Sequence, residues 1–227
     1  MTPENSTAAT DRILARYPHA PALARWHMRG RLRLCPYDAL PKHLTGAGSI
    51  LDIGCGFGHL AWYLADRMPA LRYFGVDVDA RKVRLAAACP REAEPGPAFR
   101  HGDVLEPATT AGWPARFGNI VLLDVLYLMP WDLQVRVLGW ALDRLADEAG
   151  SALVIKSMDA PTGFSGLRAV AEEWIMVSLL RRTVGSGTLL GARPPETYVA
   201  LGRARGLRCE MERLPTFNPS YILTLRR

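Results

Sequence analysis

The sequence is poor in cysteine and has no long apolar run. Its four cysteines are scattered without a C-x-x-C pair, which argues against a disulfide framework or a zinc ribbon, and we expect no bound metal. No apolar run reaches about 18 residues, so we expect no membrane span. Residues 1–20 lack the apolar stretch of a secretory signal. These absences favour a reducing, cytoplasmic setting.

Basic charge gathers at the two ends of the chain. Residues 1–47 hold seven basic against three acidic residues, and residues 157–227 hold ten against six, whereas residues 48–156 are mildly acidic. Clustered basic charge would favour nucleic acid or an anionic membrane as a partner. The basic residues are dispersed here, so we expect no nucleic-acid partner. Peripheral membrane contact and a homodimer both stay open.

Strand-like and helix-like segments alternate from residue 49 onward. This rhythm is typical of a parallel sheet with right-handed crossovers and helices on both faces. The apolar patterns predict strands over residues 49–54, 72–78, 99–101, 119–124 and 152–156 and helices over 59–68 and 81–89.

Capping residues suggest where the helices begin and end. We expect Asp79 to cap the helix over 81–89, and Asp132 to cap the next helix. Gly150 in the C′ position would end that helix. Near the carboxyl terminus, a helix over 195–205 is closed by Gly206.

Two further strands, over residues 207–213 and 221–226, are joined by a short turn, which favours an antiparallel pair. The connection between the strand ending at residue 156 and the helix at 195 is longer than one crossover helix needs. We therefore interpret residues 157–193 as an insertion. An apolar helix over 163–184, which includes Trp174, would form a lid over the substrate crevice.

A glycine-rich turn follows the first strand. Gly54 lets the chain turn tightly, and Gly56 and Gly58 let the backbone approach a ligand that a Cβ would strike. Asp77 ends the next strand, and the carboxyl ends of adjacent parallel strands share one crevice. A carboxylate there suits a pair of ribose hydroxyls. Asp52 lies just before this turn, separated from Gly54 by Ile53. Its negative charge argues against bound pyrophosphate and suits a cationic ligand.

The segments LDIGCGFGHLAWYLA, FGVDVD, HGDV and NIVLLDVLYLM resemble the class I S-adenosylmethionine-dependent methyltransferases. The resemblance covers about residues 48–156. It implies an α/β fold: a Rossmann-like, seven-stranded, mostly parallel sheet whose last strand is antiparallel, with helices on both faces. Residues 1–47 would be an N-terminal helical extension or cap, and residues 48–227 the methyltransferase domain with its lid-like insertion.

The resemblance also implies roles for individual residues. The glycine turn would lie against the amino-acid end of S-adenosylmethionine, Asp77 would hold the ribose, and Asp103 would accept a hydrogen bond from the adenine amino group. Asp124 and Val125 would lie near the sulfonium and the methionine amine. The full set implied to contact the cofactor is Asp52, Gly54, Cys55, Gly56, Gly58, Asp77, Val78, Asp103, Val104, Asp124 and Val125.

The catalytic candidates are fewer. His27 and His101 could deprotonate a hydroxyl nucleophile, and Tyr127 could line the mouth of the site. Lys156 is a third kind of candidate, although we expect the end of its strand to face solvent. Methyl transfer from a sulfonium depends chiefly on proximity and orientation, so a missing acid–base signature does not argue against an enzyme.

The leading hypothesis is a methyltransferase acting on a small or lipid-like, largely apolar organic molecule at oxygen, nitrogen or carbon. An alternative is an RNA ribose 2′-O-methyltransferase, because Asp124 and Lys156 resemble two members of a Lys-Asp-Lys-Glu set. Arg33 stands where a lysine would be needed, and no glutamate precedes the last strand. A third hypothesis is a non-catalytic cofactor-binding subunit.

Overall fold

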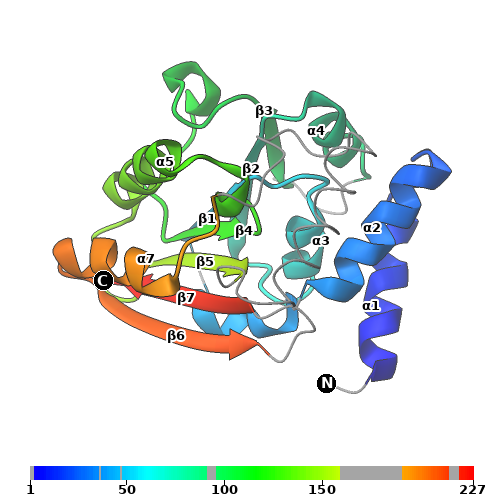
Figure 1. The fold of residues 1–227 in the computed structure, drawn as a ribbon. Coiled ribbons are helices and arrows are strands. Elements are labelled where there is room, and N and C mark those ends of the chain that lie inside the picture. Colours follow the sequence, from blue (N-terminus) through cyan, green and yellow to red (C-terminus); the bar gives the residue numbers. More distant parts are fainter. Residues whose placement is uncertain (1–2, 36, 47, 91–95, 159–190, 215–219) are drawn as a thin grey trace.

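The computed structural model describes residues 3–35, 37–46, 48–90, 96–158, 191–214 and 220–227. These residues form a seven-stranded sheet in the order β3-β2-β1-β4-β5-β7-β6 (Figure 1). Strand β7 is antiparallel to both β5 and β6, and the other pairs are parallel. The expected topology is confirmed. The strands are β1 Gly48–Ile53, β2 Leu71–Asp77, β3 Ala98–His101, β4 Asn119–Leu123, β5 Ala152–Met158, β6 Arg208–Leu214 and β7 Ser220–Arg226.

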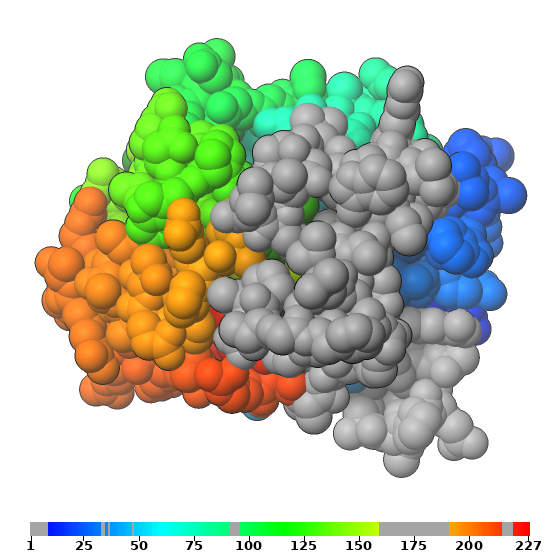
Figure 2. Space-filling model, in the orientation of Figure 1, coloured from blue at the N-terminus to red at the C-terminus, as the bar shows by residue number. Residues whose placement is uncertain are grey.

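Helices cover both faces of this sheet. The α-helices are α1 Pro3–Ala15, α2 Ala22–Leu34, α3 His59–Ala65, α4 Ala80–Ala87, α5 Trp131–Arg144 and α7 Pro195–Ala204. Short 3-10 helices are η1 Tyr37–Ala39, η2 Pro41–His43, η3 Pro107–Thr110 and η4 Leu126–Leu128. In Figure 2 the blue surface of the N-terminal helices and the green and orange surfaces of α5 and α7 lie on opposite sides of the molecule.

Successive residues of the central strands face opposite sides of the sheet. Ile50 of β1 and Val154 of β5 belong to one buried cluster, together with apolar side chains of α1, α2 and α3. Their neighbours Leu51 and Leu153 belong to a second cluster with α5 and α7. The near-continuous apolar runs of these strands therefore reflect burial on both faces.

The insertion over 157–193 and its apolar helix over 163–184 lie almost entirely outside the described residues. Gly191 is described and buried. A Cβ on Gly191 would lie 2.3 Å from the Met129 carbonyl oxygen and 2.7 Å from that of Tyr127. The chain that returns to α7 is thus packed tightly against the segment that follows β4.

Local capping chemistry predicted some helix boundaries and not others. The Asp79 carboxylate accepts hydrogen bonds from the backbone N–H groups of Arg81 and Lys82, at 3.0 and 3.2 Å, so its capping role is confirmed. Gly206, at φ +73°, follows the end of α7 as expected.

The boundaries predicted for α5 were wrong. The helix begins at Trp131 after Pro130, so Asp132 lies inside its first turn and is not the cap. It ends at Arg144, and Gly150 lies in a later turn. The backbone becomes extended at Leu145, which is fully buried and forms a parallel bridge with Phe117. Burial of Leu145 in the core therefore ends the helix before Gly150.

Candidate active site

The glycine turn joins β1 to α3. Gly54 has φ +80°, and a Cβ there would lie 2.7 Å from Cγ2 of Val125, so this close approach requires glycine. Gly56 has φ +55° and would present its Cβ to open space. At Gly58 a Cβ would lie 2.6 Å from the Phe99 ring, so the packing of this ring already requires glycine there. Of the three, Gly56 leaves the approach to the backbone open.

Asp77 holds the turn from the end of β2. Its Oδ2 accepts a hydrogen bond from the Gly56 N–H at 2.8 Å, and its Oδ1 accepts one from the Asp79 N–H at 2.8 Å. The half-buried carboxylate thus connects the glycine turn to the start of α4. Each oxygen retains a lone pair, so the carboxylate could also accept hydrogen bonds from a ligand.

Asp52 lies below the turn in a dry environment. Its side chain is buried, and the Tyr73 hydroxyl donates a hydrogen bond to its Oδ2. Burial raises the pKa of Asp52 to about 7, and the charge of Asp77 also raises it, against the lowering effects of the Tyr73 hydrogen bond and of Arg31. Asp52 thus combines a buried carboxyl with a titration close to neutral pH.

Residues after β2 and β3 line the neighbouring part of the same edge. Val78 is half exposed, an unusual position for an apolar side chain that directly follows a buried strand. Asp103 is exposed, and its Oδ1 accepts a hydrogen bond from the Leu105 N–H at 2.9 Å. Val104 beside it is buried. The apolar Val78 side chain and the exposed Asp103 carboxylate at this edge could hold the base of a nucleoside.

Cys55 does not present a reactive thiolate. It is buried, and this burial raises the pKa of its thiol well above the ordinary value. A Cβ on Gly75 would lie 3.0 Å from the Cys55 Cβ and Sγ atoms. Cys55 therefore packs between β1 and β2 as a small apolar residue.

Asp124 follows β4 in a strained conformation. Its φ of +56° is the one left-handed value among the non-glycine residues that the structure describes. The carboxylate is almost fully buried, and it lies between two cations. Lys156 Nζ is 2.5 Å from Oδ1, and an Arg31 guanidinium nitrogen is 3.1 Å from Oδ2.

The expectation that Lys156 faces solvent was wrong. Strand β5 continues past it to Met158, between β4 and β7, and Lys156 pairs with Leu123 and Ile222 in the register of the sheet. Its side chain is 9% exposed. Because β5 lies between two other strands, its end does not face solvent here. The ion pair with Asp124 offsets the free-energy cost of burying the Lys156 ammonium group.

Arg31 was not predicted as a site residue. Its guanidinium reaches the Leu123 carbonyl oxygen at 3.2 Å as well as Asp124, so helix α2 is tied directly to the end of β4. The sequence has three alternating arginines here, Arg29, Arg31 and Arg33. Their spacing does not indicate which of the three side chains points into the protein.

The two histidine candidates and the tyrosine candidate lie in three different parts of the structure. His27 on α2 is half-buried, with its ring 5.9 Å from the ring of Phe57 in the glycine turn. Tyr127 is buried on η4, three residues after Asp124. His101 is exposed at the end of β3. Thus the structure brings His27 to the glycine turn and Tyr127 to the segment after β4.

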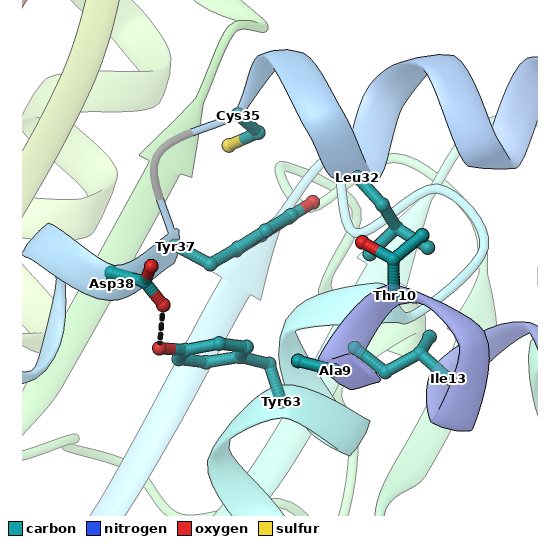
Figure 3. A pocket seen from close by; sticks show the side chains of 8 residues that line it. All are labelled: Ala9, Thr10, Ile13, Leu32, Cys35, Tyr37, Asp38 and Tyr63. Carbon is teal, nitrogen blue, oxygen red and sulfur yellow. Dashed lines mark hydrogen bonds between the residues drawn. The ribbon is translucent and has the colours of Figure 1, made fainter. Parts of the chain in front are cut away.

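A small pocket lies beside this region, between α1, α2, η1 and α3 (Figure 3). Cys35 and Tyr37 line it, and the Tyr63 hydroxyl donates a hydrogen bond to Asp38 at its rim. Burial raises the pKa of the Cys35 thiol to about 11. The Cys35 thiol is therefore not a nucleophile at neutral pH.

Among the residues that the structure describes, no three His, Cys, Asp or Glu side chains are grouped to hold a metal ion. None of the helices in those ranges has the length and apolarity to cross a bilayer.

Comparison with known proteins identifies the fold. Residues 50–148 match the family described as "Methyltransferase domain". Magnesium protoporphyrin IX methyltransferase from Synechocystis, with SAH bound, superposes with a TM-score of 0.61 at 17% identity, over 98% of this chain and 96% of that chain. The plantazolicin methyltransferase BpumL superposes with a TM-score of 0.59 at 11% identity, over the full length of both chains.

Human N-acetylserotonin methyltransferase in complex with SAM gives a TM-score of 0.59 at 15% identity, over 89% of this chain and 55% of that chain. The match to a methyltransferase domain supports an enzyme. Residues 50–148 thus match a methyltransferase domain, and the fold of the described residues is similar to that of S-adenosylmethionine-dependent methyltransferases.

Proposed function

We propose that the glycine turn and the acids around it form the S-adenosylmethionine site. The observation that carries this proposal is the Gly56–Asp77 contact, where an open glycine and a carboxylate with spare lone pairs meet at the carboxyl edge of β1 and β2. Asp77 would bind the ribose hydroxyls, Val78 and Asp103 would contact the adenine, and Asp124 and Val125 would lie near the sulfonium and the methionine amine. When bound, S-adenosylmethionine supplies a methyl group activated by a sulfonium.

Ligand-dependent thermal shift tests this assignment. At about 100 times its dissociation constant, a ligand that binds only the folded protein adds about 2.7 kcal/mol of stability. We expect S-adenosylmethionine and S-adenosylhomocysteine to stabilise the protein and NAD to leave it unchanged. Stabilisation by NAD alone would contradict the assignment.

We further propose that the acceptor is a small organic molecule with a large apolar part. Similar folds carry names that refer to a porphyrin, to plantazolicin and to N-acetylserotonin. In this chain the half-buried side chains of Val125, Leu128 and Met129 flank the segment after β4. Extracts incubated with methyl-labelled S-adenosylmethionine and examined by mass spectrometry should give a labelled small molecule.

One observation favours the RNA ribose alternative. Asp124 and Lys156, two members of the four-residue set that it needs, are in direct contact. The other two members are missing from the sequence, which has Arg33 and Ser220 in those regions. Activity that falls steeply with added salt would favour RNA, because binding to a polyanion depends on counterion release.

We also propose that residues 1–47 act as a cap on the site. Helix α1 contributes Ile13 and Leu14 to the core, and the Tyr17 hydroxyl donates a hydrogen bond to the Phe57 carbonyl oxygen of the glycine turn. A cytoplasmic location stays a prediction, as does membrane contact, and cell fractionation would test both. A homodimer is a further prediction, which sedimentation would test.

A further inference from the structure

Three charged side chains from separate elements meet at the carboxyl end of β4. We call Arg31, Asp124 and Lys156 the Arg31 cluster. Each oxygen of the Asp124 carboxylate is occupied by one cation, Lys156 at 2.5 Å and Arg31 at 3.1 Å. The exposed fractions of the side chains are 3% for Asp124, 9% for Lys156 and 35% for Arg31. The cluster is thus mostly dry, and it is open on the side of Arg31.

Among the residues that the structure describes, the cluster carries an excess of positive charge. Two cations share one carboxylate, and the neighbouring Cys35 and Tyr37 do not compensate, because burial raises the pKa of both groups and keeps them neutral. The nearby acid Asp52 is only partly ionised at neutral pH, since burial raises its pKa to about 7. An uncompensated charge in a dry environment is costly. An anion bound beside the cluster would remove this cost.

The cations also have hydrogen-bond donors to spare. An ammonium group has three N–H donors and a guanidinium has five. Within the described part of the chain, Lys156 Nζ donates to Asp124, and Arg31 donates to Asp124 and to the Leu123 carbonyl oxygen. The remaining donors suit an oxyanion, which forms short, strong hydrogen bonds with such cations.

The position of the cluster connects it with methyl transfer. Val125 directly follows Asp124, and its side chain is the group that a Cβ on Gly54 would strike. The cluster is therefore adjacent to the glycine turn, on the edge of the sheet where the proposed cofactor site lies. An acceptor must approach this same edge to reach the methyl group.

We propose that the Arg31 cluster binds an oxyanion of the acceptor, a carboxylate or an acidic hydroxyl group, and so selects acids as substrates. This inference rests on the proposed cofactor site. It adds a charged end to the apolar acceptor proposed above, and it assigns Lys156 and Arg31 the binding of the reacting oxygen.

The charge balance of the reaction agrees with this assignment. The acceptor oxygen forms the new bond to the methyl carbon, the sulfur–methyl bond breaks, and its electron pair stays on sulfur. The negative charge of the oxyanion and the positive charge of the sulfonium cancel, so no proton has to be removed. Arg31 is always protonated and cannot act as a base. The neutral methyl ester or ether no longer attracts the cluster, which favours its release.

Fractionation of the acceptor pool tests the proposal. A small-molecule extract is separated on an anion-exchange column at pH 8, and the retained and unretained fractions are incubated with the protein and methyl-labelled S-adenosylmethionine. We expect labelled product from the retained, anionic fraction, and we expect the product to have lost one negative charge. Labelled product from the unretained fraction alone would overturn the proposal.

Charge variants locate the effect. Arg31→Met and Lys156→Met should each raise the Michaelis constant of the anionic acceptor at least about tenfold, the loss expected for one hydrogen bond to a charged group. In each variant Asp124 keeps one cationic partner, which protects the fold. The matched control is Arg29→Met on the same helix, where Arg29 lies at the surface near Asp11, and it should leave that constant within about twofold of wild type.

The oxyanion at the cluster could belong to the acceptor or to the amino-acid carboxylate of the cofactor, and measurements of cofactor binding distinguish the two. Calorimetric titration with S-adenosylhomocysteine should give the same affinity for Arg31→Met and for wild type. If that affinity falls while the affinity for 5′-methylthioadenosine, which lacks the amino-acid carboxylate, stays constant, the cluster binds the cofactor and our assignment is wrong. If no fraction yields labelled product although S-adenosylhomocysteine binds, the proposed small-molecule acceptor fails, and this inference fails with it.

Discussion

The Asp77 carboxylate accepts a hydrogen bond from the Gly56 backbone N–H at 2.8 Å, and this contact joins the end of β2 to the glycine turn. The other carboxylate oxygen accepts from the Asp79 N–H, so the turn and the start of α4 share one acid. The contact fixes the backbone at the glycine whose Cβ position is open. At the proposed cofactor site, the Asp77 carboxylate therefore holds both the glycine turn and the start of α4.

Asp52 should make stability depend on pH. Its pKa is raised from 3.8 to about 7 by burial, so the folded protein retains a proton that the unfolded chain has released. The contribution of protonated Asp52 is complete below pH 3.8, falls as pH rises, and is lost above about pH 7, with a slope of up to about 1.4 kcal/mol per pH unit. Urea unfolding between pH 5 and 8 measures it.

Asp52→Asn removes this titration and keeps an oxygen that can accept from Tyr73. The variant should gain stability relative to wild type as pH increases, and all other ionisable groups are common to both proteins. Parallel curves of unfolding free energy against pH would show that Asp52 is ionised throughout.

Gly54→Ala should destabilise the protein by both strain and collision. Alanine at φ +80° is strained, and its Cβ would lie 2.7 Å from Cγ2 of Val125. Gly112→Ala is a matched control, because Gly112 has φ +75° and nothing within 4 Å of its Cβ position. Strain of this kind costs about 1–3 kcal/mol. Thermal unfolding should show a larger loss at Gly54.

Adding Val125→Ala to Gly54→Ala separates the two effects. The double variant should recover part of the stability lost by Gly54→Ala, because the collision is removed and the strain remains. If the two substitutions are strictly additive, the close approach of Val125 does not explain the glycine.

Gln134 should be important for stability although it lies far from the glycine turn in the sequence. Its Nε2 donates to the carbonyl oxygens of Met129 and Gly191, at 2.9 and 2.6 Å, and its Oε1 accepts from the Tyr198 hydroxyl at 2.7 Å. Gln134→Met leaves these buried groups without this partner, so unfolding in urea should show a loss of about 2–4 kcal/mol.

Tyr198→Phe is the smaller test of the same network, since it removes one donor and leaves both carbonyl contacts of Gln134. We expect it to cost about 1 kcal/mol. Equal losses for Tyr198→Phe and Gln134→Met would mean that the contacts with Met129 and Gly191 contribute nothing.

The sequence predicted features that depend on local chemistry. The Asp79 cap and the Gly206 stop each depend on neighbouring backbone groups, and the structure contains both. The strand–helix rhythm likewise predicted the parallel direction of the first five strands. Such features need no information about distant parts of the chain.

Features that depend on tertiary contacts were missed. Helix α5 ends early because Leu145 is buried and forms a bridge with Phe117, which precedes β4 and is distant in the sequence. Lys156 is buried because Asp124 is within reach. Arg31 could not be told apart from Arg29 by composition or spacing, since only the packing of α2 on the sheet decides which arginine faces β4.

Calorimetric titration of S-adenosylhomocysteine into wild type and Asp77→Ala tests the central claim most directly. Wild type should bind one equivalent, and Asp77→Ala should bind at least about tenfold more weakly, because hydrogen bonds to a carboxylate are worth about 1.5–3 kcal/mol each. Asp66→Ala, at an exposed acid beyond the end of α3, should bind like wild type. Equal affinities for Asp77→Ala and wild type, with both proteins folded, would contradict the account.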